Sequence, residues 1–145
     1  MTKTFDHILV PYNGTSGSQK GFRKAVALAQ VTNAKITIVT CLEERPVFGF
    51  FKTKTSRQEF EKECRFVQKQ HDELEEFAKE HNVVFDSKIV KNGLASTKIL
   101  EYAKKHDIDL IIMAKKKISS SYEKIHYQST IENVFRNTHC PVLIL

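Results

Sequence analysis

Two spacings of apolar residues alternate along this chain of 145 residues. Short, nearly continuous apolar runs are typical of strands buried on both faces of a parallel sheet. They cover residues 7–11, 36–42, 83–90, 107–114 and 140–145. Between the runs, apolar residues recur every three or four positions, which predicts amphipathic helices. The alternation of strands and helices predicts an α/β fold, an open five-stranded parallel sheet with helices on both faces and right-handed crossovers.

The spacing predicts four helices, and the second is the longest. The first follows a turn over residues 12–18, and the last two cover about 95–106 and 129–137. We expect the long helix to begin at Ser56, because Ser56 and Glu59 form a capping box, and to end near His81. Its predicted inner face carries Phe60, Cys64, Val67, His71, Leu74 and Ala78. His71 is interpreted as a packed or rim histidine, since only Glu75 stands at helical spacing from it as a second metal-binding residue.

One segment, Glu43 to Thr55, fits neither spacing. Pro46 and Gly49 break regular structure there, and apolar residues lie between and beside them. Long irregular segments of this kind serve as lids or as surfaces for partners. A loop folded back over the core is the other reading.

Composition adds bounds on the class of protein. Hydrophobic residues make up 41% and charged residues 28%, an ordinary globular balance, and the length suits one domain over residues 1–145. No apolar run is long enough to span a membrane, and no signal peptide is visible at the N-terminus. Three cysteines, odd in number and widely spaced, fit neither a disulfide framework nor a metal pattern. We therefore expect a cytoplasmic protein without a membrane partner.

The net charge of +6 permits contact with anions such as nucleotides, RNA or acidic lipid. No nucleic-acid motif and no interleaving of aromatic and basic residues accompany it, so a nucleic-acid partner is not expected. The charge fits a solvated basic surface. Part of it lies in Lys115–Lys117, which could instead form an anion cradle.

The loop after Ala114 is the leading candidate for a ligand site, because open α/β sheets bind ligands where strands deliver their carboxyl ends. Ser129 and Glu132 form a capping box, so Ser129 is predicted to cap a helix and could also contact a phosphate. No nucleophile, base and acid can be assembled from spacing, so no enzyme is expected. Cys140 begins an apolar strand and is expected to be buried.

The chain resembles the universal stress protein family at four places. They are the opening strand and turn at residues 7–15, the start of the third helix at 93–103, the fourth strand at 107–113 and the closing Cys-Pro-Val strand at 140–145. The resemblance implies a strand order of 3-2-1-4-5 and a homodimer paired through the fifth strand. The expected interface residues are Val142, Leu143, Ile144 and Leu145.

Members that bind ATP carry a Gly-x-x-Gly-x9-Gly-Ser/Thr motif after strand four and an Asp after strand one. Here Lys115, Ile118 and Gln128 stand at the glycine positions, Asn13 stands at the acid, and Ser129 alone is kept. Glycine lets backbone amides approach phosphates, Ile is β-branched, and Asn supplies no carboxylate. The resemblance therefore implies a degenerate nucleotide site. Its candidate residues are Pro11, Tyr12, Asn13, Gly14, Cys41, Met113, Ala114, Lys115, Ile118, Gln128, Ser129 and Thr130.

Two functions stay open. The first is a non-enzymatic, dimeric stress-response protein that needs no cofactor and acts through protein partners or a remodelled pocket. The alternative is a switch that binds ATP or another adenine nucleotide through Lys115–Lys117 and could hydrolyse it slowly. In the nucleotide-binding switch, Tyr12 would stack on the base. In the non-enzymatic stress-response protein, it would plug an empty cleft. Cys41 is expected to be a pocket-wall or core residue.

Overall fold

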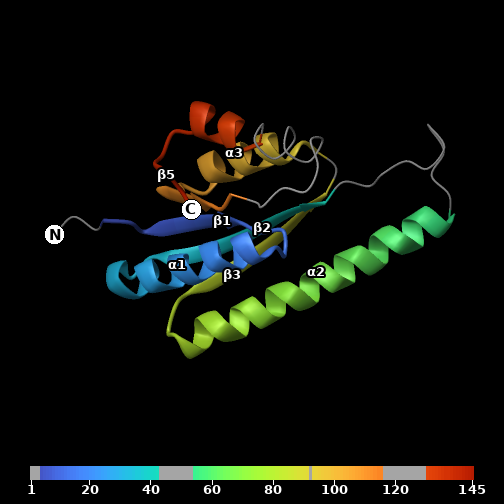
Figure 1. The fold of residues 1–145 in the computed structure, drawn as a ribbon, viewed down its shortest axis with the longest axis horizontal. Coiled ribbons are helices and arrows are strands. Elements are labelled where there is room, and N and C mark those ends of the chain that lie inside the picture. Colours follow the sequence, from blue (N-terminus) through green and yellow to red (C-terminus); the bar gives the residue numbers. More distant parts are fainter. Residues whose placement is uncertain (1–3, 43–53, 92, 116–129) are drawn as a thin grey trace.

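A five-stranded parallel sheet forms the centre of the protein in the computed structural model, which describes residues 4–42, 54–91, 93–115 and 130–145. The strands are β1 (His7–Pro11), β2 (Lys35–Leu42), β3 (Phe85–Lys91), β4 (Leu110–Met113) and β5 (Val142–Ile144). The helices are α1 (Ser16–Thr32), α2 (Lys54–Glu80), α3 (Ala95–Lys105) and a helical segment over residues 130–137. The strand order is β3-β2-β1-β4-β5, so the predicted order is confirmed (Figure 1).

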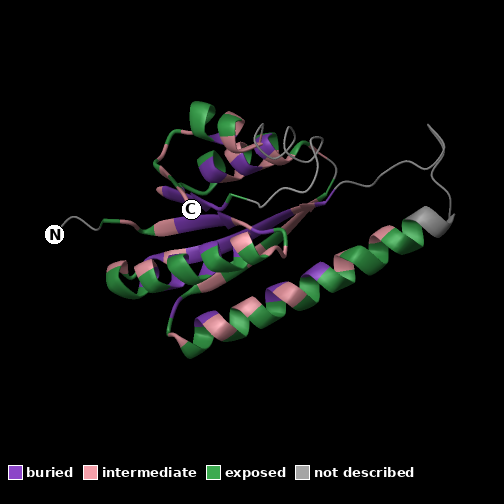
Figure 2. Ribbon diagram, in the orientation of Figure 1, coloured by how far each residue is buried: buried purple, intermediate pink, exposed green. Residues whose placement is uncertain are grey.

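Helices cover both faces of the sheet. α1 and α2 lie on one face, and α3 and the segment 130–137 lie on the other (Figure 1). Successive residues of β1 point to opposite faces, so Ile8 and Val10 pack with α1 while Leu9 packs with α3. Buried residues concentrate in the strands and on the helix faces turned toward them (Figure 2). The core is therefore two apolar layers separated by the sheet.

Several predicted boundaries move. β3 begins at Phe85 and not at Val83, because Asn82 is left-handed (φ 59°) and Val84 is still exposed. β4 begins after Asp107, which is also left-handed (φ 52°), and β5 begins after Pro141, which cannot donate a ladder bond. α1 ends at Asn33, its left-handed C-cap (φ 61°).

The predicted capping box at Ser56 is wrong. α2 begins at Lys54, so Ser56 lies two residues inside the helix. A capping residue needs a non-helical backbone, and the helical backbone that precedes Ser56 excludes this role. Lys54 and Thr55, which were predicted to end the irregular segment, are the first two residues of α2. The rest of that segment, residues 43–53, lies outside the described part of the chain. Its role as a lid or a docking surface therefore stays a prediction.

The predicted inner face of α2 is buried most deeply in the second half of the helix. Val67, His71 and Ala78 are buried, while Phe60 and Cys64 are only half-buried. α2 contacts β3 and β2. His71 is 1% exposed, and its Nε2 lies 2.7 Å from the Thr40 hydroxyl, so the prediction of a packed histidine is confirmed.

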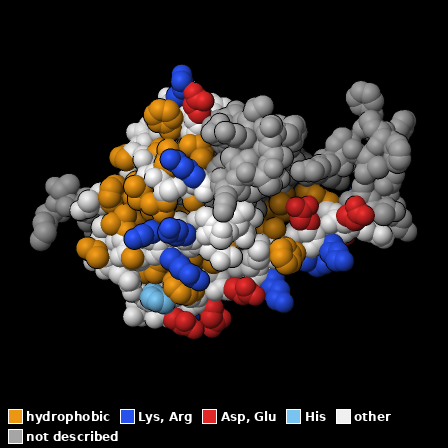
Figure 3. Space-filling view, viewed as in Figure 1, with side chains coloured by type: hydrophobic (Ala, Val, Ile, Leu, Met, Phe, Trp, Pro, Cys, Tyr) orange, Lys and Arg blue, Asp and Glu red, His pale blue; other side chains and the backbone are white. Residues whose placement is uncertain are grey.

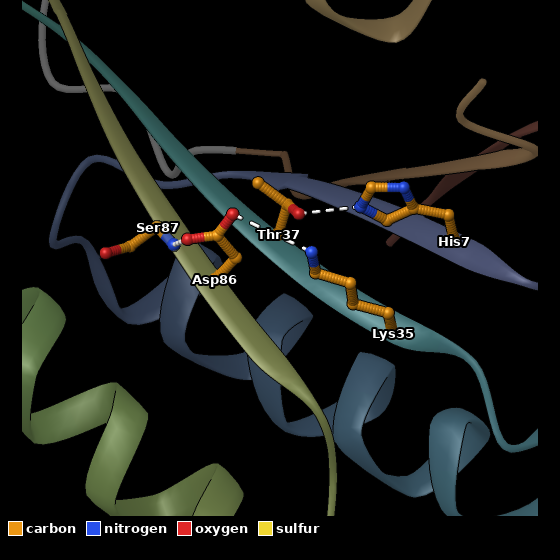
Figure 4. Close-up of polar contacts among 5 residues, drawn as sticks. All are labelled: His7, Lys35, Thr37, Asp86 and Ser87. Atoms are coloured by element: carbon orange, nitrogen blue, oxygen red, sulfur yellow. Dashed lines mark hydrogen bonds and ion pairs between the residues drawn. The ribbon is translucent and has the colours of Figure 1, made fainter. Parts of the chain in front are cut away.

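Polar contacts hold the amino ends of the strands in register. The Asp109 carboxylate accepts hydrogen bonds from the backbone amides of Asp6 (2.7 Å) and His7 (3.0 Å). His7 Nε2 lies 2.7 Å from Thr37 Oγ1, and Lys35 forms an ion pair with Asp86 (3.7 Å), as Figure 4 shows. Burial, and next the charge of Lys35, lower the pKa of His7. None of the described helices is both long and apolar enough to cross a membrane.

Candidate functional site

A cavity of about 160 Å³ lies at the carboxyl ends of the central strands. Seven of the predicted site residues line it: Pro11, Tyr12, Asn13, Cys41, Met113, Ala114 and Thr130. Four lining residues were not predicted: Ser18, Val39, Ala95 and Ile99. Gly14 and Lys115 do not line the cavity, and Ile118, Gln128 and Ser129 lie outside the described residues. The structure thus brings the described candidates to one edge of the sheet, and their role in binding stays a prediction.

The parallel register explains this gathering. Pro11 at the end of β1 pairs with Val39 of β2, and β4 ends beside β1. Side chains two residues apart on a strand share a face, so Val39 could have been found from Cys41. Likewise Ala95 and Ile99 are four residues apart on α3 and share one helix face. These apolar walls suit a flat, apolar group better than a charged one.

The β1–α1 loop is held by its own side chains. Asn13 Oδ1 accepts hydrogen bonds from the Thr15 amide (3.2 Å) and the Thr15 hydroxyl (2.7 Å). Thr15 in turn caps α1 by accepting from the amide of Ser18 (3.2 Å). The Asn13 oxygen is therefore already used to hold the loop.

Lys115, the second residue after β4, is also engaged. The Lys115 amide donates to the Leu145 carbonyl (2.9 Å), which ties the loop to the end of β5. α1 approaches closely here, because a Cβ on Gly17 would lie only 3.0 Å from the Lys115 carbonyl oxygen. The described non-glycine residues with positive φ are Asn33, Asn82 and Asp107, so Lys115 does not adopt the conformation that glycine would permit. The Lys115 amide is not free to meet a phosphate.

Tyr12 lies between the cavity and the core. Tyr12 borders the cavity, but its ring packs in the core between α1 and α2, edge-on to His71 with ring centroids 6.4 Å apart. Its hydroxyl is hydrogen-bonded to Gln19 of α1, and burial raises the pKa of the phenol. The reason is strand alternation, since Tyr12 follows Ile8 and Val10 on the face opposite α3. Whether the ring plugs the cleft or stacks on a base stays a prediction.

A buried polar chain links Tyr12 to α2. Thr40 Oγ1 donates to the Tyr12 carbonyl (2.7 Å), so it accepts from His71 Nε2 (2.7 Å). This arrangement makes His71 a neutral Nε2–H tautomer. Nδ1 is then a buried acceptor without a hydrogen-bond partner within the described part of the chain. Burial lowers the pKa of His71, and the smaller effect of Asp72 raises it.

Cys41 lines the cavity wall, as predicted, while Cys140 is partly exposed and not buried; its Sγ lies 3.3 Å from the Thr138 hydroxyl. The difference arises because β5 starts two residues after Cys140. Among residues 4–42, 54–91, 93–115 and 130–145, no three His, Cys, Asp or Glu side chains gather as a metal site would require.

Comparison with known proteins gives consistent matches. The model of the universal stress protein family matches residues 4–145. A universal stress protein of Methanocaldococcus jannaschii is 23% identical, with 97% of this chain and 82% of that protein covered. The structure of universal stress protein UspA from Lactobacillus plantarum has a TM-score of 0.81 at 22% identity, with 97% of each chain covered. A universal stress protein in complex with cAMP has a TM-score of 0.72 at 18% identity, with 97% and 96% covered.

Proposed function

Because the chain belongs to the universal stress protein family, we propose that it is a non-enzymatic, dimeric regulator of the stress response that does not bind ATP with ordinary affinity. It acts in the cytoplasm through protein partners or through occupancy of the carboxyl-end cavity. The match over residues 4–145 supports one domain across residues 1–145. No disulfide joins Cys41, Cys64 or Cys140, which agrees with a cytoplasmic setting.

The engaged Lys115 amide is the observation that carries this proposal. Phosphate sites at the start of helices and loops depend on free backbone amides that converge on the anion. At the first glycine position of the ATP motif, this chain has a lysine whose amide bonds to Leu145 (2.9 Å). At the acid position it has Asn13, whose oxygen bonds to Thr15. Both positions therefore serve the fold rather than a triphosphate.

We expect calorimetric titration with ATP and Mg²⁺ to give no micromolar binding. A matched gain-of-function variant carries Asn13→Asp, Lys115→Gly, Ile118→Gly and Gln128→Gly, which rebuilds the motif of ATP binders. If the motif is what the chain lacks, this variant should bind ATP at least about tenfold more tightly than the natural sequence. Micromolar binding by the unaltered protein would refute the proposal.

A nucleotide-binding switch is the second candidate function. The related structure in complex with cAMP supports it, as do the apolar cavity walls formed by Val39, Ile99 and Met113, which could hold an adenine ring. Lys115–Lys117 would then supply point charges for a phosphate. Absorbance at 260 nm that persists in purified protein, and tighter binding of AMP than of adenosine, would favour this function over the first.

The dimer would form through β5. This strand lies at the edge of the sheet and pairs with β4 alone among the described strands. Leu143 is 41% exposed on it, and an exposed apolar edge favours pairing with a second copy. The resemblance to the family points to the same strand, Val142 to Leu145.

We expect sedimentation equilibrium at micromolar concentration to show twice the chain mass of 16.7 kDa. Leu143→Lys should shift the population toward monomer, because it brings two like charges together across a twofold axis. Phe66→Lys is the matched control, since Phe66 is 60% exposed on α2, which packs against β2 and β3 toward the other edge. A monomeric natural protein would contradict the dimer.

A further inference from the structure

A second cavity, of about 250 Å³, lies between α1 and α2. It is on the face of the sheet opposite α3, so it is separate from the cavity at the carboxyl ends of the strands. α1 contributes Gln19, Phe22 and Arg23, and α2 contributes Gln70, Glu73 and Phe77. Tyr12, which also borders the first cavity, lines this one too.

The inner wall of this cavity is apolar and rigidly packed. Phe22 is 2% exposed, and its ring lies 5.7 Å from the ring of Phe77. Leu74 also lines the cavity, and Tyr12 is almost fully buried. An apolar group placed against these rings would be removed from water, which is favourable.

The outer wall carries opposite charges on opposite sides. α1 has three basic residues and no acidic one, while the facing stretch of α2 from Asp72 to Glu80 is mostly acidic. Figure 3 shows Lys and Arg side chains over α1 and Asp and Glu side chains over the neighbouring end of α2. From these two rows, Arg23 and Glu73 line the cavity itself.

Arg23 and Glu73 do not pair with each other. The ion pairs found among the described residues join Lys35 to Asp86, Lys98 to Glu101, and Arg136 to Glu132. Yet both charges act on the Tyr12 hydroxyl, where Glu73 raises and Arg23 lowers the phenol pKa, after the larger effects of burial and of the bond to Gln19. The two charges thus face the same space from two helices without forming an ion pair with each other.

We propose that this cavity binds a free α-amino acid with an aromatic or branched aliphatic side chain. Arg23 binds the carboxylate through its planar guanidinium, and Glu73 accepts from the ammonium group. The Gln19 and Gln70 amides offer further donors and acceptors, and the side chain of the ligand packs on Phe22 and Phe77. A zwitterion would bridge these two charges, which do not pair with each other. The volume suits this class, since a cavity of about 150 Å³ holds benzene.

The test is calorimetric titration of the full chain with L-phenylalanine and L-leucine, alongside analogues that each lack one recognition group. Phenethylamine lacks the carboxylate, 3-phenylpropionate lacks the ammonium group, and glycine lacks the side chain. We expect each analogue to bind at least about tenfold more weakly than L-phenylalanine, because charge-assisted hydrogen bonds or apolar burial are lost.

Variants that each remove one charge test which group of the ligand Arg23 and Glu73 bind. Arg23→Gln should weaken L-phenylalanine binding about tenfold and leave phenethylamine binding unchanged, since that ligand has no carboxylate. Glu73→Gln should weaken L-phenylalanine equally and leave 3-phenylpropionate unchanged. Both side chains are exposed, so the fold should persist, which circular dichroism checks. Lys24→Gln and Glu76→Gln are the matched controls, exposed neighbours on the same helices that do not line the cavity.

Several outcomes would overturn the proposal. They are absence of binding by either amino acid, analogues that bind as tightly as the zwitterion, and losses in the control variants as large as those in Arg23→Gln and Glu73→Gln. ATP binding, present or absent, bears only on the cavity at the strand ends. Failure of one proposal is therefore distinguishable from failure of the other.

Discussion

Lowering the pH from about 8 to about 5 is expected to destabilise this protein, and His71→Leu is expected to remove much of that loss. His71 is 1% exposed, donates through Nε2 to Thr40, and leaves Nδ1 without a partner among the described residues. A proton on Nδ1 would add a buried positive charge, which is costly unless it is paired. Protonation therefore opposes the packing of α2 on the sheet.

The sign follows from proton linkage. Burial lowers the folded-state pKa of His71 below the ordinary value of 6.5 that applies to the unfolded chain. Below pH 6.5 the unfolded state thus binds more protons, so the stability present above that pH is lost as the pH falls from 6.5 toward the folded pKa. The pKa of His7 is lowered too, by burial and by Lys35, and it contributes with the same sign.

Chemical denaturation in urea across this pH range measures the effect. The natural protein should lose stability steeply below pH 6.5. The stability of His71→Leu should depend less steeply on pH, because leucine cannot titrate. As the pH falls, this variant should become more stable relative to the natural protein. Phe66→Leu, at an exposed position on the same helix, is the control and should follow the natural curve. Parallel curves for His71→Leu and the natural protein would contradict this account.

Gly14→Ala is expected to cost about 2 kcal/mol of unfolding free energy, the second large effect. Gly14 has φ +80°, a left-handed conformation that a Cβ disfavours. The added Cβ would also lie 2.9 Å from Gln70 Nε2, so the side-chain amide of Gln70, on α2, must move. Because the loop is tied to α1 through Asn13 and Thr15, it cannot relax without loss of those bonds.

Gly93→Ala is the matched control for this substitution. A Cβ on Gly93 meets only the side chain of Lys98, which is flexible, and the backbone there is not left-handed. Urea denaturation should therefore show little change for Gly93→Ala and a clearly lower midpoint for Gly14→Ala. Equal midpoints for the two variants would show that neither the left-handed backbone nor the contact with Gln70 contributes.

The sequence by itself determined the order of the elements, and its resemblance to the universal stress protein family implied the neighbours of each strand. Continuous apolar runs such as Leu110–Met113 can be recognised as strands without a structure, because a strand buried on both faces needs no alternation of apolar and polar residues. The ends of α1 depend on local hydrogen bonds, since Thr15 caps its start and Asn33 caps its end through contacts with residues three or four positions away. Of the residues that border the strand-end cavity, Pro11 and Met113 follow from the rule that carboxyl ends of parallel strands meet at one edge, whereas Val39 was not predicted.

The tertiary structure decided what depends on side-chain direction and on distant partners. An apolar run does not say which face each residue takes, so the place of Tyr12 with α1 and α2 followed only from the pairing of the strands and the helices that cover them. The Lys115 amide bonds to Leu145, thirty residues away, and no local pattern predicts such a contact. Arg23 and Glu73 lie fifty residues apart and face one cavity only because two helices pack side by side on the same face of the sheet. Long-range contacts of this kind depend on the packing of the whole chain, whereas spacing reports only on neighbours in sequence.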